Sequence, residues 1–175
     1  MEIGELMKKA TIFHGHICPG VAIGVLVAKY ALDHGFEHSP DEELVAVVEN
    51  SNCSVDALQA ILSTTYGKGN LIHNDYGKNN FNFYDRNTKK AIKLVLKGDV
   101  FTDKKLSRDE KVQRLLNSKA SDIFNIYDIE FNPPGLAEIR ESVPCEICGE
   151  LTMSSRLVSY TNRDICIPCY KSLRK

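Results

Sequence analysis

Two pairs of cysteines near the C-terminal end constrain the fold of this chain more than any other feature. The pairs are Cys145-x-x-Cys148 and Cys166-x-x-Cys169, and seventeen residues separate them. Four thiolates at this spacing can surround a zinc ion as a tetrahedron, and the metal then replaces the hydrophobic core that so short a segment cannot build. We therefore expect a structural zinc site at Cys145, Cys148, Cys166 and Cys169 rather than a redox role.

The residues around these cysteines predict a small domain separate from the rest of the chain. LVSY at 157–160 followed by TNR indicates a hairpin, and CIPCYKSLRK opens a short helix. NPPG at 132–135 interrupts any regular element before this region. The expected organisation is a core domain over residues 1–131, a linker over 132–142 and a zinc finger over 143–175.

Composition limits the classes of protein to which the chain can belong. Its 175 residues are 43% hydrophobic and 26% charged, with a formal net charge of −1, so one main core is expected and no large basic surface for nucleic acid. The N-terminus lacks the pattern of a signal peptide, and the longest uncharged run, 17–28, is too short to cross a bilayer. We expect a cytoplasmic protein without a membrane contact, whose cysteines stay reduced.

The N-terminal 131 residues alternate between helical and strand patterns. Helices are expected at 2–10, from Gly20 to a stop at Gly35 with Pro19 and Gly20 in the first turn, and over 54–62 with Asn52 or Ser54 as its cap. LVAVV at 44–48 indicates a central strand, and the alternation at 90–97 indicates a strand with one solvent-exposed face. Segments 71–74 and 81–84 suggest a hairpin or a strand pair with a longer loop, and a capping box at 107–110 opens a helix to about 118.

The segment FHGHICPG at 13–20 concentrates metal-ligating side chains just before the buried helix. In an extended loop over 11–19, His14, His16 and Cys18 alternate onto one side, as a metal ion requires. Cys18 and Cys53 each lie at a predicted helix N-terminus, where the pKa of a thiol is lowered and the thiolate is favoured. The simpler alternative is that buried cysteines and capping histidines have only structural roles.

If His16, Cys18 and Cys53 meet, they offer one nitrogen and two sulfurs, which suits zinc with a fourth position open. His14, His16, Cys18 and Cys53 are accordingly the candidate catalytic residues. Glu49, Asp56 and His14 are each close enough in sequence to orient a ligand or transfer a proton, and the sequence does not choose among them. Thiol chemistry at Cys18 without a metal is a further alternative. GKGN at 67–70 lacks the spacing of a phosphate loop and favours a tight turn.

The motifs HGHICPG, NCSVDALQ, GKGN and DYGK, in this order over about residues 12–80, resemble the FmdE family, which takes its name from formylmethanofuran dehydrogenase. The C-terminal cysteines are similar to those of its two-domain members. The resemblance implies an α+β fold with a thioredoxin-like core, a mixed sheet flanked by helices, and a treble-clef zinc finger. It also implies a metal-binding active site carried onto His14, His16 and Cys18, with Cys53 as a further thiol, and a homodimer.

These observations lead to two functional hypotheses of different class. The first is a metalloprotein auxiliary to formylmethanofuran and one-carbon metabolism, either a zinc-dependent enzyme or an accessory component of formylmethanofuran dehydrogenase. Its core would hold zinc or another divalent metal and act on a small molecule. The second is a non-catalytic protein that delivers metal, or an adaptor that docks through its finger onto a protein complex or, less favoured, nucleic acid.

Overall fold

The computed structural model describes residues 1–98, 100 and 105–174, which leaves the last residue of the expected finger outside it. The chain forms two compact units, Met1–Ala137 and Glu138–Lys175. Each unit has its own cluster of buried hydrophobic residues. In the described part of the chain, no helix combines the length and the apolar character needed to cross a membrane.

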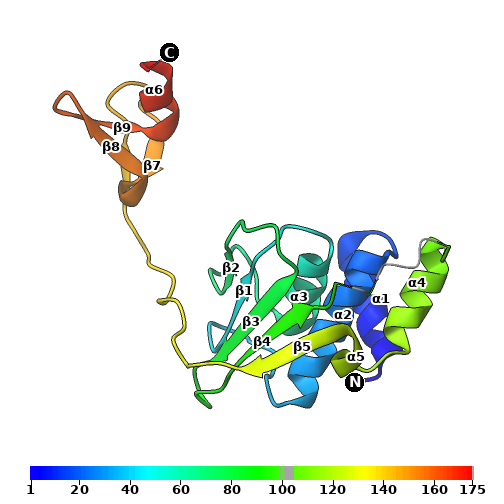
Figure 1. The fold of residues 1–175 in the computed structure, drawn as a ribbon. Helices are drawn as coiled ribbons and strands as arrows, with labels where there is room; N and C mark the ends of the chain where they lie inside the picture. Colours follow the sequence, from blue (N-terminus) through cyan, green and yellow to red (C-terminus); the bar gives the residue numbers. More distant parts are fainter. Residues whose placement is uncertain (99, 101–104, 175) are drawn as a thin grey trace. The chain divides into compact units, whose positions relative to one another are not determined.

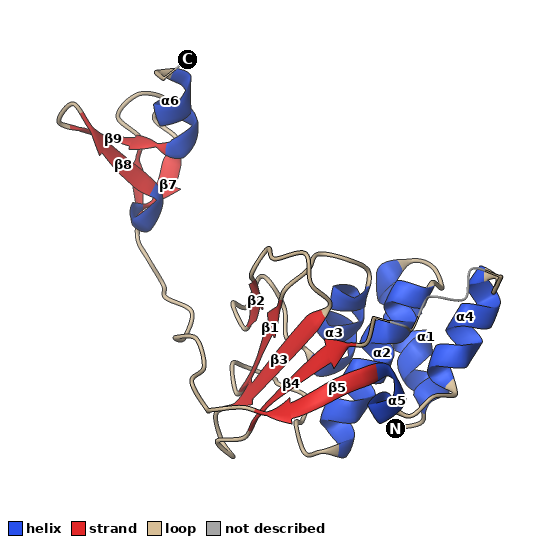
Figure 2. Cartoon of the chain, in the orientation of Figure 1, coloured by secondary structure: helices blue, strands red, loops and turns tan. Residues whose placement is uncertain are grey.

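The first unit is a mixed α+β fold built on a five-stranded sheet, as expected for the class (Figure 1). Its elements in chain order are α1 (Ile3–His14), α2 (Pro19–Asp33), β1 (Leu44–Val48), α3 (Ser54–Leu62), β2 (Leu71–His73), β3 (Asn80–Asp85), β4 (Ala91–Leu96), α4 (Arg108–Leu116), α5 (Ala120–Ile123) and β5 (Phe124–Asp128). The strand order is β2-β1-β3-β4-β5. Figure 2 shows the helices of this unit gathered on one side of the sheet.

The two segments after α3 are strands, but the predicted pairing between them, as a hairpin or through a longer loop, is wrong. β2 pairs with β1 in parallel, whereas β3 pairs with the opposite edge of β1 in antiparallel orientation. The crossover through α3 places β2 on one edge of β1, and β3 then pairs with the other edge. The DYGK turn between β2 and β3 therefore passes over the end of β1. The central position of β1 agrees with the burial of all five of its residues.

Helix α1 is longer than predicted and includes His14. The expected helix ends at residue 10, but the structure continues it until Gly15 adopts a left-handed conformation with φ of 92° and donates its N–H to Thr11. The exposed side chains of Ile12 and Phe13 interrupt the amphipathic pattern, which explains the short prediction. His14 therefore projects from a helix terminus, and only His16 and Cys18 belong to the connecting loop.

Helix α2 begins where the sequence predicted, with Cys18 as its N-cap and Pro19 in its first turn. It packs directly on α3 through two glycines on one face, Gly20 and Gly24. A Cβ at Gly24 would lie 2.1 Å from the Ser54 carbonyl oxygen, and one at Gly20 would lie 3.0 Å from Cys53 Cβ. The absence of these two side chains brings the beginnings of both helices together.

Two elements of the first unit are not apparent from the sequence. α5 is a single turn, too short for a helical period to be visible, and β5 follows it directly. β5 completes the edge of the sheet by pairing with β4, and Phe124 is buried at its start. The capping box at Ser107 that opens α4 is confirmed, with Ser107 and Glu110 each accepting the other's backbone N–H.

The second unit consists of two small hairpins followed by a short helix. Its elements are β6 (Ser142–Pro144), β7 (Leu151–Met153), a 3-10 turn (Ser154–Arg156), β8 (Leu157–Tyr160), β9 (Arg163–Cys166) and α6 (Ile167–Ser172). β8 and β9 form the predicted hairpin, with Thr161 and Asn162 in left-handed conformations at its turn. The buried cluster of this unit is Cys145, Ile165 and Cys166, so two of its three members are sulfur ligand candidates.

Replacing Gly24 by alanine tests the contact between α2 and α3. The added methyl group has no space against Ser54, so we expect a loss of roughly 1–3 kcal/mol in the free energy of unfolding. Gly4→Ala in α1 is the matched control, because a Cβ there meets no atom within 4 Å and alanine favours the helix. Urea denaturation of both variants measures the difference, and equal stability of the two would contradict the proposed contact.

Candidate metal centre and adjoining pocket

Three side chains with metal-ligating atoms converge where α1 ends and α2 begins. His14, His16 and Cys18 each offer one nitrogen or sulfur, and these three atoms lie within 4.8 Å of one another. The two imidazole rings are 4.5 Å apart between centroids. We expected this grouping from alternation along a loop, whereas the structure forms it from a helix terminus, a loop and an N-cap.

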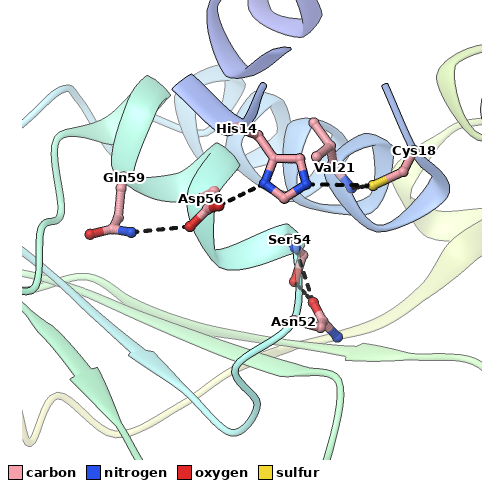
Figure 3. Close-up of polar contacts among 7 residues, drawn as sticks. All are labelled: His14, Cys18, Val21, Asn52, Ser54, Asp56 and Gln59. Atoms are coloured by element: carbon pink, nitrogen blue, oxygen red, sulfur yellow. Dashed lines mark hydrogen bonds and ion pairs between the residues drawn. The ribbon is translucent and has the colours of Figure 1, made fainter. Parts of the chain in front are cut away.

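His14 is held in a defined orientation by Asp56 from α3. Its Nδ1 lies 2.7 Å from Asp56 Oδ2, and its Nε2 lies 3.9 Å from Cys18 Sγ (Figure 3). The Asp56 carboxylate can only accept, so Nδ1 donates to it and Nε2 faces Cys18. Gln59 donates to the other Asp56 oxygen at 3.4 Å. The sequence left Glu49, Asp56 and His14 open as the orienting group, and the structure shows Asp56 in contact with a candidate ligand.

Glu49 lies in a different network. It accepts a hydrogen bond of 2.7 Å from Asn80 and pairs with Lys93 at 3.4 Å. Val48 and Asn50, its chain neighbours, line the pocket described below, and Glu49 does not. The alternation of side chains along an extended chain accounts for this difference. Glu49 therefore joins the end of β1 to β3 and β4 rather than taking part in the cluster.

The two cysteines of the first unit are neighbours at the contact between α2 and α3. The Cys18 sulfur is buried and accepts the Val21 N–H at 3.4 Å, as expected at a helix N-terminus. Cys53 is the N-cap of α3, but its side chain accepts no capping bond, and Asn52 holds the helix start by accepting from Ser54. The sulfur of Cys53 lies outside the mutual group of His14, His16 and Cys18.

The expected lowering of the pKa of Cys53 is wrong. Burial raises the pKa of this thiol, and the neighbouring Cys18 raises it further. The backbone N–H of Cys53 lowers the pKa by less than these two causes raise it, and the Cys53 side chain does not cap the helix.

A pocket of 380 Å³ adjoins this cluster and includes His14 and Cys53 in its wall. The rest of its polar lining consists mainly of amides and hydroxyls, and its apolar lining comes from Val48, Val55 and Leu71. The lining residues besides His14 and Cys53 are Val48, Asn50, Ser51, Asn52, Val55, Asp56, Gln59, Tyr66, Leu71 and His73. Tyr66 and His73 were not predicted, because the β2 crossover that brings them to α3 is not visible as a local pattern. A small organic molecule could enter beside the cluster.

The GKGN segment forms a turn, with the Gly69 N–H donating to the Tyr66 carbonyl at 3.2 Å, and its side chains bond to backbone carbonyls. Lys68 donates to the carbonyl oxygens of Ser39 and Pro40, at 2.6 and 3.3 Å. Asn70 is fully buried and donates to the Leu44 carbonyl at 2.9 Å, which ties the segment to the start of β1. These bonds agree with the expected tight turn.

In the second unit, the sulfurs of Cys145, Cys148, Cys166 and Cys169 also lie within 4.8 Å of one another, so this cluster could hold a metal ion. The Cys145 sulfur receives the N–H groups of Ile147 and Cys166 at 3.5 and 3.2 Å. Backbone N–H groups, those of Cys148 and Cys166 first, lower the pKa of Cys145 to about 6. One thiolate of the predicted tetrahedron is thus available at neutral pH without the metal.

Comparison with known proteins identifies a family, a curated relative and a solved structure. The family model described as "FmdE, Molybdenum formylmethanofuran dehydrogenase operon" matches residues 13–128. A probable S-adenosyl-L-methionine-binding protein of Archaeoglobus fulgidus is 28% identical over 96% of this chain, and the match covers 53% of that protein. The chain thus spans about half the length of this curated relative.

A solved structure has the same fold. It is a tungsten formylmethanofuran dehydrogenase FmdE-like protein from Syntrophus aciditrophicus, which matches with a TM-score of 0.72. The match covers 97% of this chain and 92% of that protein at 21% identity, so it establishes similarity of fold.

Replacing Cys145 by serine tests whether the fold of the second unit depends on its four cysteines and whether the first unit folds independently of them. Because this unit has almost no other buried side chains, we expect the loss of one bound metal per chain and of the dispersed amide signals of residues 138–174. The first unit has its own core and should keep its thermal unfolding midpoint. Two-dimensional NMR with metal analysis reports both, and a dispersed finger spectrum in the variant would contradict the prediction.

Proposed function

The chain belongs to the FmdE family of the molybdenum formylmethanofuran dehydrogenase operon, and on this basis we propose that its first unit is a metal centre that binds a small molecule. The observation that carries the proposal is the convergence of His14, His16 and Cys18 beside a pocket. We propose zinc as the metal in both units, with Cys145, Cys148, Cys166 and Cys169 closing a treble-clef finger in the second.

The donor set supports zinc in the first unit. Two imidazoles and one thiolate are ligands that zinc accepts, and three protein ligands leave one position open. Cys53, whose sulfur is close to Cys18 and which lines the pocket, is proposed as the residue at this open side. An open zinc site acidifies a bound water or polarises a carbonyl group when the metal is present.

The Asp56–His14 pair provides independent support for a metal-binding role. A carboxylate that fixes the protonated nitrogen of a histidine is the usual partner of a metal ligand, because it sets the tautomer and raises the basicity of the other nitrogen. The His14 side chain is largely buried and Asp56 is more accessible, at 11% and 37% exposure. His14 is thereby oriented before any metal arrives.

The pocket suggests the kind of molecule that the centre would bind. Its amides and the exposed Tyr66 can recognise a polar molecule with a planar group, and its described lining contains no lysine or arginine to bind a phosphate. S-adenosyl-L-methionine is the first ligand to test, because the Archaeoglobus fulgidus relative is described as binding it. We place this function in a cytoplasmic homodimer auxiliary to formylmethanofuran and one-carbon metabolism.

The fold is compatible with a thioredoxin-like core. The β1-α3-β2 crossover, the antiparallel β3 and β4 and the following α4 support this proposal, with the first two helices and β5 as additions. Cys18 and Cys53 would then lie at the N-termini of two helices of the core region, α2 and α3.

An adaptor role is the second candidate function, and the surface of the second unit favours it. Large apolar side chains are exposed there, among them Leu151 and Met153 on β7 and Leu173 after α6. Purified formylmethanofuran dehydrogenase should then bind the wild-type chain and fail to bind Leu151→Asp, which keeps all four cysteines. Equal binding of both, or none by either, would contradict the adaptor role.

Asp56→Asn tests the metal centre directly. Loss of the carboxylate removes the group that orients His14, so we expect the zinc affinity of the first unit to fall about 10- to 100-fold. Competition with a zinc chelator measures this affinity. Asp75→Asn is the matched control, because Asp75 is 87% exposed and lies outside the cluster and the pocket lining. Equal affinities of the two variants would contradict the role of Asp56.

Tyr66→Ala tests the pocket without disturbing the core, since Tyr66 is 78% exposed. Calorimetric titration of the zinc-loaded chain with S-adenosyl-L-methionine should show binding that is at least about 10-fold weaker in this variant, because a stacking surface is lost. Tyr76→Ala, an exposed tyrosine outside the pocket lining, should bind as the wild type does. A similar loss in both tyrosine variants, or no binding to the wild type, would contradict the proposed ligand site.

A further inference from the structure

We propose that Cys18 and Cys53 form a redox-sensitive dithiol that closes to a disulfide when a two-electron oxidant such as a peroxide enters the pocket. Closure would also release the metal of the first unit, and this second statement rests on the proposed function. Both reacting groups, the thiols of Cys18 and Cys53, belong to the protein.

The geometry at Gly20 carries the proposal. A Cβ built on Gly20 would lie 3.6 Å from the Cys53 sulfur and 3.8 Å from the Cys18 sulfur, so both sulfurs border the same small space. No side chain separates them there, because the residue is glycine. Both cysteines are free thiols, and both lie at helix starts whose backbones are held together by the packing of α2 on α3.

The two thiols differ in access and environment, as a reactive pair requires. Cys53 is partly exposed and lines the 380 Å³ pocket, which gives a small oxidant a path to the pair. Cys18 is 6% exposed, and its sulfur receives the Val21 N–H at the N-terminus of α2. The other described cysteines all belong to the second unit, so within the first unit these two thiols can pair only with each other.

The reaction balances with hydrogen peroxide as the oxidant. The Cys18 thiol attacks one peroxide oxygen, its proton passes to the departing oxygen as the O–O bond breaks, and a sulfenic acid and one water form. The Cys53 sulfur then displaces the hydroxyl group of the sulfenic acid, which leaves as a second water while the S–S bond forms. Two thiols lose two protons and two electrons, and the peroxide is reduced to two waters.

Oxidation and metal binding would exclude each other at this site. A cysteine binds a metal ion as its thiolate, and a cysteine in a disulfide has no thiolate to offer. Without Cys18, His14 and His16 remain as two imidazoles from the group of three. The pair would therefore couple the metal content of the first unit to the oxidation state of its surroundings, and a thiol reductant would reverse the change.

Peptide mapping of the zinc-loaded full chain tests the proposal. After treatment with a small molar excess of hydrogen peroxide and digestion with trypsin, we expect peptides 10–29 and 30–68 to be joined, with two hydrogens lost. The finger peptides 141–156 and 164–171 should be unmodified at the same dose. One of two zinc ions should be released, and a thiol reductant should restore the separate peptides and the zinc.

Cys53→Ser is the matched control, because it removes the second thiol and leaves Cys18 in place. It should give no joined peptide, and its Cys18 should be oxidised to sulfinic acid instead. The same sulfinic acid in the wild-type chain, or no oxidation at Cys18 and Cys53, would overturn the dithiol. A joined peptide in a chain that carries only the finger's zinc would retain the dithiol and overturn the metal centre.

Discussion

The close packing of α2 on α3 is the contact on which the candidate site depends. Gly20 and Gly24 allow the two helix starts to approach until Cys53 lies beside Cys18. The same approach places Asp56 of α3 within 2.7 Å of His14 at the end of α1. The site thus combines His14 from α1, Cys18 from the start of α2, and Cys53 and Asp56 from the start of α3. Larger side chains at the two glycines would move the starts of α2 and α3 apart.

Metal plays a different role in each unit. The second unit buries little besides Cys145, Ile165 and Cys166, so the proposed zinc contributes to its folding. The first unit has an extensive core between its sheet and helices, built from residues such as Phe81, Phe83 and Leu58, and does not need a metal to fold. A cluster of ligands that the fold does not require, placed beside a pocket, is better explained by function than by stability.

The features that depend on local patterns could be predicted from the sequence. The start of α2 at Pro19, the α4 capping box and the four-cysteine cluster follow from neighbouring residues. The Asp56–His14 pair spans 42 positions and depends on how α1 meets α3, which no local pattern contains. The same holds for β2 and β3: their segments are recognisable strands, but their partner is set by the α3 crossover.

The central claim is that His14, His16 and Cys18 hold a metal ion in addition to the one in the finger. The most direct test is the number of zinc ions per chain, measured by native mass spectrometry on the full chain and on Cys18→Ser. We expect two zinc ions for the wild type and one for the variant, with unchanged secondary structure by circular dichroism. One zinc ion in the wild type, or two in the variant, would contradict this claim.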